Sequence, residues 1–181
     1  MSADARSLTE LFATASLGAP EKAVGFVMWR VLHRYLREVD RALAPLDLTH
    51  LQFMTLAMAG WLGRTDEPVT QARLARSSDI HPMQISHMLK TLETKGMVVR
   101  PRGADVRTKH VEVTEAGVTA LRDALPLVID VQQRLFGDAG GPDGDLLNTL
   151  LSLEERPQDE PRPIENTERP GDSTPERSVF S

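Results

Sequence analysis

The residues of this sequence that could bind a metal are few and widely spaced. It has no cysteine, and its five histidines are His33, His50, His81, His87 and His110. A helical metal site commonly uses two histidines four residues apart, and no pair here has that spacing. We therefore expect no metal site, no disulfide and no thiol chemistry.

The short motifs of the common catalytic chemistries are also missing from the sequence. It contains no glycine-rich phosphate loop, no G-x-S-x-G and no H-E-x-x-H. Paired carboxylates occur only where we expect solvated surface, as at Glu154 and Glu155. The sequence therefore predicts a protein that is not an enzyme and that uses no cofactor.

Charge is unevenly distributed along the chain. The formal net charge is -5, which taken alone argues against a nucleic-acid partner. Residues 68–115, however, hold eight basic and five acidic side chains, or +3, so the remaining 13 basic and 21 acidic side chains give -8. This segregation is typical of a DNA-reading segment on an acidic body.

Apolar periodicity and capping residues predict a mainly α-helical fold with one small β-hairpin. Thr49 with Gln52, and Thr114, have the pattern of helix N-caps, and Pro82 is tolerated in the first turn of a helix. The residues between helices include Asp79, which tolerates left-handed backbone. We expect helices over residues 21–44, 49–63, 69–76, 81–95, 114–137 and 143–154, with a hairpin over 97–114.

Three segments of different character divide the chain. We expect a flexible N-terminal arm over residues 1–20, a folded domain over 21–155 and a disordered acidic, proline-rich tail over 156–181. The N-terminus does not resemble a signal peptide, and no apolar run is long enough for a membrane span. These observations predict a cytoplasmic protein that does not bind membranes.

The segment over residues 74–117 reads LARSSDIHPMQISHMLKTLETKGMVVRPRGADVRTKHVEVTEAG. Its order of LA, a turn, a helix ending in LE-x-KG, a hydrophobic strand, D-x-R and T-x-x-G resembles the reading head of the MarR family of bacterial regulators. That resemblance implies a winged helix-turn-helix with a reading head over residues 68–114. It also implies a homodimer in which the first and last helices of two chains interlock.

The resemblance further implies that the helix over residues 81–95 enters the major groove of double-stranded DNA. Ile85, Met88, Leu89 and Leu92 would face inward. We expect the outward arc to contact DNA, with Gln84 suited to adenine; alternatively these residues are only solvated surface. The arc holds Pro82, Met83, Gln84, Ser86, His87, Lys90 and Thr91.

The wing over residues 100–110 would enter the adjacent minor groove. Arg107 corresponds to the arginine that the family carries in the wing, and Asp105 would brace it. Arg100, Arg102 and Lys109 would add phosphate contacts. Exposed arginines in a hairpin can also be merely solvated.

By resemblance, a small effector would bind between the dimer helices and the head, and its binding would release a repressor from its operator. Trp29, His33 and Arg37 recur every four residues and form an aromatic, titratable and cationic stripe suited to an aromatic acid. Phe53 and Met54 would also line this site. These residues have an alternative structural role in core and interface, and the whole winged helix has an alternative function as a protein-interaction module without DNA binding.

Overall fold

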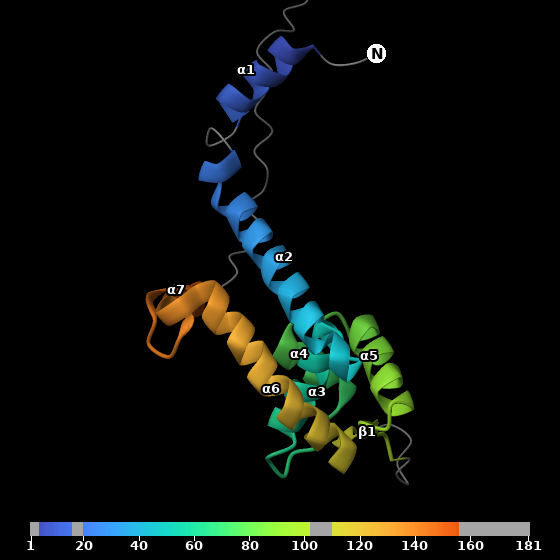
Figure 1. The fold of residues 1–181 in the computed structure, drawn as a ribbon. Helices are drawn as coiled ribbons and strands as arrows, with labels where there is room; N and C mark the ends of the chain where they lie inside the picture. Colours follow the sequence, from blue (N-terminus) through green and yellow to red (C-terminus); the bar gives the residue numbers. More distant parts are fainter. Residues whose placement is uncertain (1–3, 16–19, 102–109, 156–181) are drawn as a thin grey trace, which may run out of the picture.

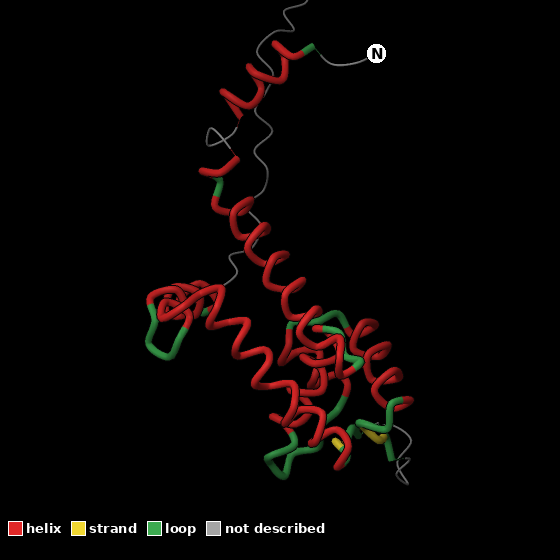
Figure 2. The backbone as a smooth tube through the Cα atoms, viewed as in Figure 1, coloured by secondary structure: helices red, strands yellow, loops and turns green. Residues whose placement is uncertain are grey.

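The computed structural model describes residues 4–15, 20–101 and 110–155, which form a mostly helical chain with one small sheet (Figures 1 and 2). The α-helices are α1 (Ala5–Ala15), α2 (Val24–Leu43), α3 (His50–Leu62), α4 (Gln71–Ser78), α5 (Pro82–Thr94), α6 (Glu115–Phe136) and α7 (Asp145–Glu154). Short 3-10 helices are η1 (Pro20–Lys22), η2 (Ala44–Leu46) and η3 (Gly137–Gly140). This order confirms the predicted winged helix-turn-helix fold class.

Side-chain caps are present at the starts of α3 and α6, as the sequence predicts. The hydroxyl of Thr49 accepts the backbone N–H of Gln52, and the Gln52 side chain accepts the N–H of Thr49, so the predicted capping box is present. Thr114 caps α6 by accepting from Gly117. Each cap satisfies a backbone donor that has no partner within its helix.

The wing is a two-stranded antiparallel sheet of β1 (Val98–Val99) and β2 (Glu112–Val113). Thr70 also pairs with His110 in an isolated bridge, and the N–H of Val111 donates to the carbonyl of Val69 at 2.8 Å. The helix expected from residue 69 therefore begins at Gln71, because Thr70 is its N-cap and residues 69 and 70 pair with the wing instead.

One apolar core joins the head to the two long helices. In the head it contains side chains of α3, α4, α5 and both strands, with Leu56, Leu74, Leu89 and Val98 fully buried. The C-terminal half of α2 contributes Val39 and Leu43, and α6 contributes Ala124, Val128 and Val131. The N-terminal half of α2 extends away from this core (Figure 1).

The sequence predicted a flexible arm over residues 1–20, but the structure has helix α1 there. It carries three exposed apolar side chains at helical spacing, Leu8, Leu11 and Phe12. The predicted tail over residues 156–181 lies outside the described residues. Within the described ranges, every helix is too short or too polar to cross a lipid bilayer.

Candidate DNA-binding interface

Helices α4 and α5 form a helix-turn-helix whose turn is closed by side chains from both sides. Asp79 ends α4 with left-handed backbone at φ 50°, as its residue type predicts. The Ser78 hydroxyl donates to the carbonyl of Leu74 at 2.7 Å. The Gln71 amide crosses the turn and donates to the carbonyl of Pro82 at 3.1 Å, so the first turns of the two helices are held together.

Helix α5 has one buried and one exposed face. Ile85, Leu89 and Leu92 are fully buried, as predicted for the inward face, whereas Met88, also predicted there, is only partly buried. Helix α5 packs against α3 and α4. Met83 on the opposite side is 76% exposed. A helix with this division presents its outer side chains to any partner that approaches the head.

The structure places all seven predicted contact residues of α5 on its accessible or partly accessible surface. Five are exposed, namely Pro82, Met83, Gln84, His87 and Lys90. Ser86 and Thr91 are half-buried, and the Thr91 hydroxyl donates to the carbonyl of His87 at 3.1 Å within the helix. That bond leaves the Thr91 hydroxyl less available to DNA than the sequence analysis assumed.

His81 has a role that the sequence analysis missed. It is the N-cap of α5, and its ring atom Nδ1 accepts the N–H of Met83 at 3.2 Å. Histidine is an unusual cap, but a side-chain acceptor directly before a proline at the first helical position was a signal for it. The ring and the carbonyl of His81 accept the first backbone N–H groups of α5, so the helix dipole alone is left to favour an anion at this end.

At its C-terminal end, α5 is tied to the junction between α2 and α3. The Lys95 ammonium donates to Gln52 Oε1 at 3.1 Å, pairs with a carboxylate oxygen of Asp47 at 3.0 Å and donates to the Asp47 carbonyl. Gln52 is the buried residue of the α3 capping box. Gln52 therefore takes part in the cap of α3 and also holds the C-terminal end of α5.

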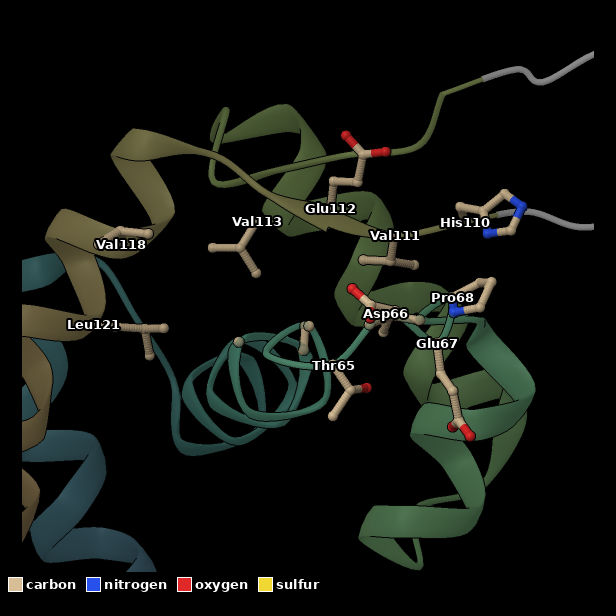
Figure 3. Close-up of a pocket in the computed structure, with 14 residues that line it drawn as sticks. Thr65, Asp66, Glu67, Pro68, His110, Val111, Glu112, Val113, Val118 and Leu121 are labelled. Carbon is tan, nitrogen blue, oxygen red and sulfur yellow. The ribbon is translucent and has the colours of Figure 1, made fainter.

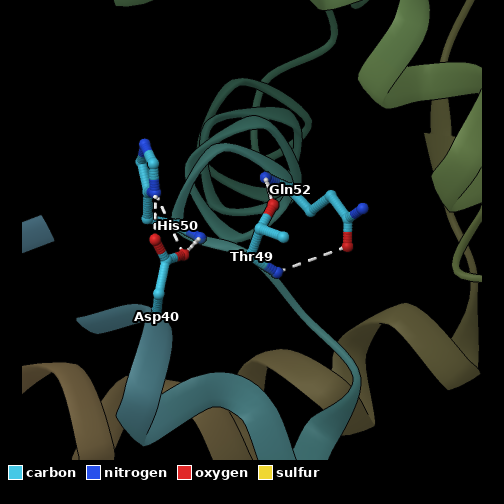
Figure 4. A network of polar contacts seen from close by, with 4 residues as sticks. All are labelled: Asp40, Thr49, His50 and Gln52. Carbon is cyan, nitrogen blue, oxygen red and sulfur yellow. Dashed lines mark hydrogen bonds and ion pairs between the residues drawn. The ribbon is translucent and has the colours of Figure 1, made fainter. Parts of the chain in front are cut away.

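A second polar tie joins α2 to α3 at the same junction (Figure 4). Asp40 accepts the backbone N–H of His50 at 2.7 Å, and its carboxylate lies 3.0 Å from the His50 ring nitrogen Nδ1. Figure 4 shows this pair beside the Thr49 and Gln52 capping box at the start of α3. The orientation of α2 is thus linked through α3 to Lys95 and α5.

Of the predicted wing contacts, only Arg100 lies among the described residues. Its guanidinium pairs with the Glu93 carboxylate of α5, with Nε at 3.1 Å from Oε2, and only 22% of its side chain is exposed. Arg100 therefore fastens the wing to α5, a role that the sequence analysis did not predict. Arg102, Asp105, Arg107 and Lys109 lie outside the described residues.

The predicted effector residues are only partly brought together. The Trp29 and His33 rings lie 4.2 Å apart between centroids, and His33 Nδ1 lies 2.8 Å from the Trp29 carbonyl oxygen. Arg37 and Met54 are exposed, but Phe53 is 4% exposed within the core. Phe53 therefore does not reach a surface that a ligand could contact, because it packs among the apolar residues of the head.

One further charge effect lies beside this stripe on α2. Arg41 donates to the Glu38 carboxylate at 2.7 Å, and this hydrogen bond holds the pKa of Glu38 below its usual value. The pair is one turn from Arg37. A carboxylate that stays ionised here would oppose an anionic ligand unless Arg41 remains paired with it.

A cavity of about 490 Å³ lies elsewhere, between the C-terminal end of α3, the loop that follows it, β2 and the first turns of α6 (Figure 3). Val111, Val113, Val118 and Leu121 are among its apolar lining residues. None of the five predicted effector residues lines it. The sequence analysis missed this cavity because its walls are far apart in the chain.

Comparisons with known proteins agree with this geometry. Residues 48–117 match the family model described as a winged helix DNA-binding domain. The chain is 34% identical over 126 residues to the HTH-type transcriptional regulator YdcH of Bacillus subtilis (strain 168), covering 69% of this chain and 86% of YdcH.

Three solved structures, of two proteins, resemble the chain along most of their length. CouR from Rhodococcus jostii RHA1, bound to p-coumaroyl-CoA, has a TM-score of 0.63 and 30% identity, covering 75% of this chain and 92% of CouR. The Mycobacterium tuberculosis MarR family protein Rv2887 in complex with DNA has a TM-score of 0.56 and 25% identity, covering 74% and 98%. Rv2887 has also been solved with p-aminosalicylic acid, at a TM-score of 0.52 and 27% identity, covering 72% and 95%. With the helix-turn-helix, the wing and the long flanking helices in place, the chain belongs to the MarR family of winged helix-turn-helix transcriptional regulators.

Proposed function

We propose that this regulator is a homodimeric repressor that binds a pseudo-palindromic operator and is released by a small ligand. The observation that carries the proposal is the division of α5 into a fully buried face and an exposed face that holds Met83, Gln84 and His87. In a dimer, two such helices would enter successive major grooves about one helical turn apart. The wing would lie over the adjacent minor groove.

The DNA complex of Rv2887 supports this mode of binding, since it is a MarR family protein with the same fold. Gln84 is exposed in the first turns of α5, and a glutamine can bond adenine through two hydrogen bonds. Met83 could pack on thymine methyl groups. Lys90, exposed about two turns further along, would contact phosphate and make binding salt-dependent.

The test is fluorescence anisotropy of the full chain on the DNA upstream of its own gene. We expect Gln84→Ala to weaken specific binding about ten-fold or more, because one bidentate base contact is lost. Gln133→Ala is the matched control, since Gln133 is an exposed glutamine on α6, and it should bind like the parent. If the two variants bind equally well, Gln84 does not read the operator.

Repression is tested separately from binding. A reporter gene with the bound sequence overlapping its promoter should fall in expression when the regulator is present and recover in the Gln84→Ala variant. Expression that rises instead would identify an activator. If the chain shows no salt-dependent affinity for any DNA in a random pool, the alternative of a protein-interaction module is favoured.

The subunit interface of the proposed dimer is supported by apolar surface on the helices that flank the head. Val27, Met28 and Leu32 of α2 are exposed, as are Leu125 and Ile129 of α6. Apolar faces of this extent are typical of subunit interfaces. Sedimentation analysis of the full chain should give a dimer at micromolar concentration.

We further propose that the effector is an aromatic acid held by the Trp29 stripe. The neighbouring Trp29 and His33 rings, which are tilted relative to each other, offer an aromatic surface, and Arg37 one turn away offers a cation. The structure of Rv2887 with p-aminosalicylic acid supports this class of ligand. We expect p-aminosalicylate to release the chain from DNA, and Arg37→Gln to weaken that release, whereas Arg34→Gln on the same helix should not.

A further inference from the structure

The cavity in Figure 3 is chemically distinct from the Trp29 stripe on α2. Its walls come from α3, the loop over residues 63–69, the strand segment over 110–113 and α6. Its volume of about 490 Å³ lies in the range of sites that hold small organic molecules. It is large enough for a ligand with one aromatic ring.

The walls that the strand segment and α6 contribute to this cavity are apolar apart from Glu112 and His110. Val111 and Val113, which alternate with Glu112 along the strand, turn toward it, and Val118 and Leu121 close it from α6 (Figure 3). Gly60 lies on the α3 side, where a Cβ atom would come within 3.2 Å of the Leu121 side chain. The cavity therefore accepts an apolar body against these side chains.

The charged groups around the cavity are of one sign. Asp66, Glu67 and Glu112 line it together with His110, and no lysine or arginine is among the described residues that do so. Figure 3 shows the Glu112 carboxylate directed away from the cavity. Glu67 is paired with Arg73 at 3.0 Å, so its charge is already balanced.

Asp66 differs from these two carboxylates. Its side chain is turned toward the cavity in Figure 3, beside Thr65 and Val111. Its carboxylate is exposed to solvent and makes no ion pair or side-chain hydrogen bond with any residue that the structure describes, so a positive charge on a ligand can pair with it. A cation seated on the apolar wall would supply that charge without displacing an existing partner.

We infer that this cavity binds a small organic cation, an amine on an apolar body, with Asp66 as its counter-ion. The site is independent of the proposed aromatic-acid site and has the opposite charge preference. Because β2 belongs to the wing and α6 to the long helices, an occupant would contact both at once. An anion of the same shape is disfavoured by the Asp66 carboxylate.

The test is NMR titration of the full chain, labelled at its valine methyl groups, with 2-phenylethylamine, which is a cation at pH 7. We expect saturable shifts of the Val111, Val113 and Val118 methyl signals, with a dissociation constant of roughly millimolar size. The matched probe is 3-phenylpropionate, which has the same ring and a similar length but a negative charge. It should bind at least about five-fold more weakly.

Two variants locate the site. Asp66→Asn keeps the size of the side chain and should weaken 2-phenylethylamine about five- to ten-fold, whereas Glu112→Gln removes a carboxylate that points away and should change binding less than about two-fold. Val118→Phe fills the cavity and should abolish the shifts of Val111 and Val113. The inference is overturned if the amine gives no saturable shift, if both probes bind equally, or if Asp66→Asn binds like the parent.

Discussion

The reading head and the N-terminal half of α2 differ in how far their apolar side chains are buried. In the head, Ile85, Leu89 and Leu92 of α5 are fully buried. The outer face of the same helix is mostly polar, with Gln84, His87 and Lys90 exposed. In α2, every large apolar residue from position 24 to 32 is exposed, including Val27, Trp29 and Leu32. Helix α5 therefore has a buried face and an exposed face within a single chain, whereas the N-terminal half of α2 has no buried face.

This difference indicates which part of the fold one chain completes alone. The head buries its apolar side chains within one chain, against the C-terminal half of α2 and part of α6. The exposed half of α2 resembles the apolar surfaces of Ile129 on α6 and Leu151 on α7, which are also uncovered. In the proposed dimer these surfaces would cover one another, so an identical substitution should have different consequences in the two regions.

The largest effect that we expect comes from Leu89→Ala in the head. Removing a fully buried leucine should lower the free energy of unfolding by about 2–5 kcal/mol, because it leaves a cavity among close-packed side chains. The matched variant is Leu32→Ala, where the leucine is 51% exposed. Leu32→Ala should weaken subunit association while leaving the stability of the dissociated chain within about 0.5 kcal/mol of the parent.

Urea unfolding measures the first effect, and sedimentation at several protein concentrations measures the second. The comparison fails if Leu32→Ala destabilises the dissociated chain as much as Leu89→Ala does. It also fails if Leu32→Ala leaves the dimer unchanged while the chain remains folded.

Gly117→Ala should have the next largest effect, at the point where the wing meets α6. A Cβ atom at Gly117 would lie 2.1 Å from the Met97 carbonyl oxygen and 2.7 Å from the Val113 side chain. Since a backbone oxygen cannot move as a side chain can, we expect a loss of about 1–3 kcal/mol in unfolding free energy. Ala116→Gly at the exposed neighbouring position should cost no more than about 1 kcal/mol. Equal losses in the two variants would contradict a clash between the Gly117→Ala side chain and Met97.

Local patterns explain which features the sequence could predict. The Thr49 and Thr114 caps depend on residues three positions apart, and the buried face of α5 depends on steps of three and four. These relationships are contained in short windows of the sequence. For the same reason Leu8, Leu11 and Phe12 could have identified α1, which the expectation of a flexible arm left out.

The features that were missed depend on distant residues. Lys95 meets Gln52 from 43 positions away, and the cavity forms where α3, the residues around Val111 and Leu121 of α6 converge. The pairing of Arg100 with Glu93 competes with the phosphate contact that its charge alone predicted. Which partner a long cationic side chain takes is decided by tertiary packing and not by residue type.

A smaller effect is expected at the tie between the head and the α2–α3 junction. Lys95→Met removes the bonds to Gln52 and Asp47, and we expect a loss of about 1 kcal/mol in unfolding free energy, because Gln52 is buried and loses a donor. The Asp47 carboxylate is exposed and adds little. Operator affinity should also fall, since the C-terminal end of α5 is less fixed.

Lys90→Met, within α5, is the control. It separates the structural role of Lys95 from the DNA-contacting role proposed for Lys90. Lys90 is exposed, so its loss should leave stability within about 0.5 kcal/mol of the parent. It should instead reduce the salt dependence of DNA binding by about one unit of slope. If Lys95→Met is as stable as Lys90→Met, the tie does not hold the head against α2.

The smallest effect that we expect is at Asp79, in the turn between α4 and α5. The head is well packed, but this turn contains one unfavourable backbone conformation. Asp79 has φ at 50°, which glycine adopts at lower cost than aspartate. Asp79→Gly should therefore raise the free energy of unfolding, but only by about 0.5 kcal/mol, since glycine also gains entropy in the unfolded chain. Ser77→Gly, two residues earlier and within α4, should lower it by up to about 1 kcal/mol. Urea unfolding measures both changes in the free energy of unfolding. If they have opposite signs, the left-handed backbone at Asp79, and not the polarity of the segment, determines the effect. If both variants are less stable than the parent, the Asp79 side chain itself stabilises the turn.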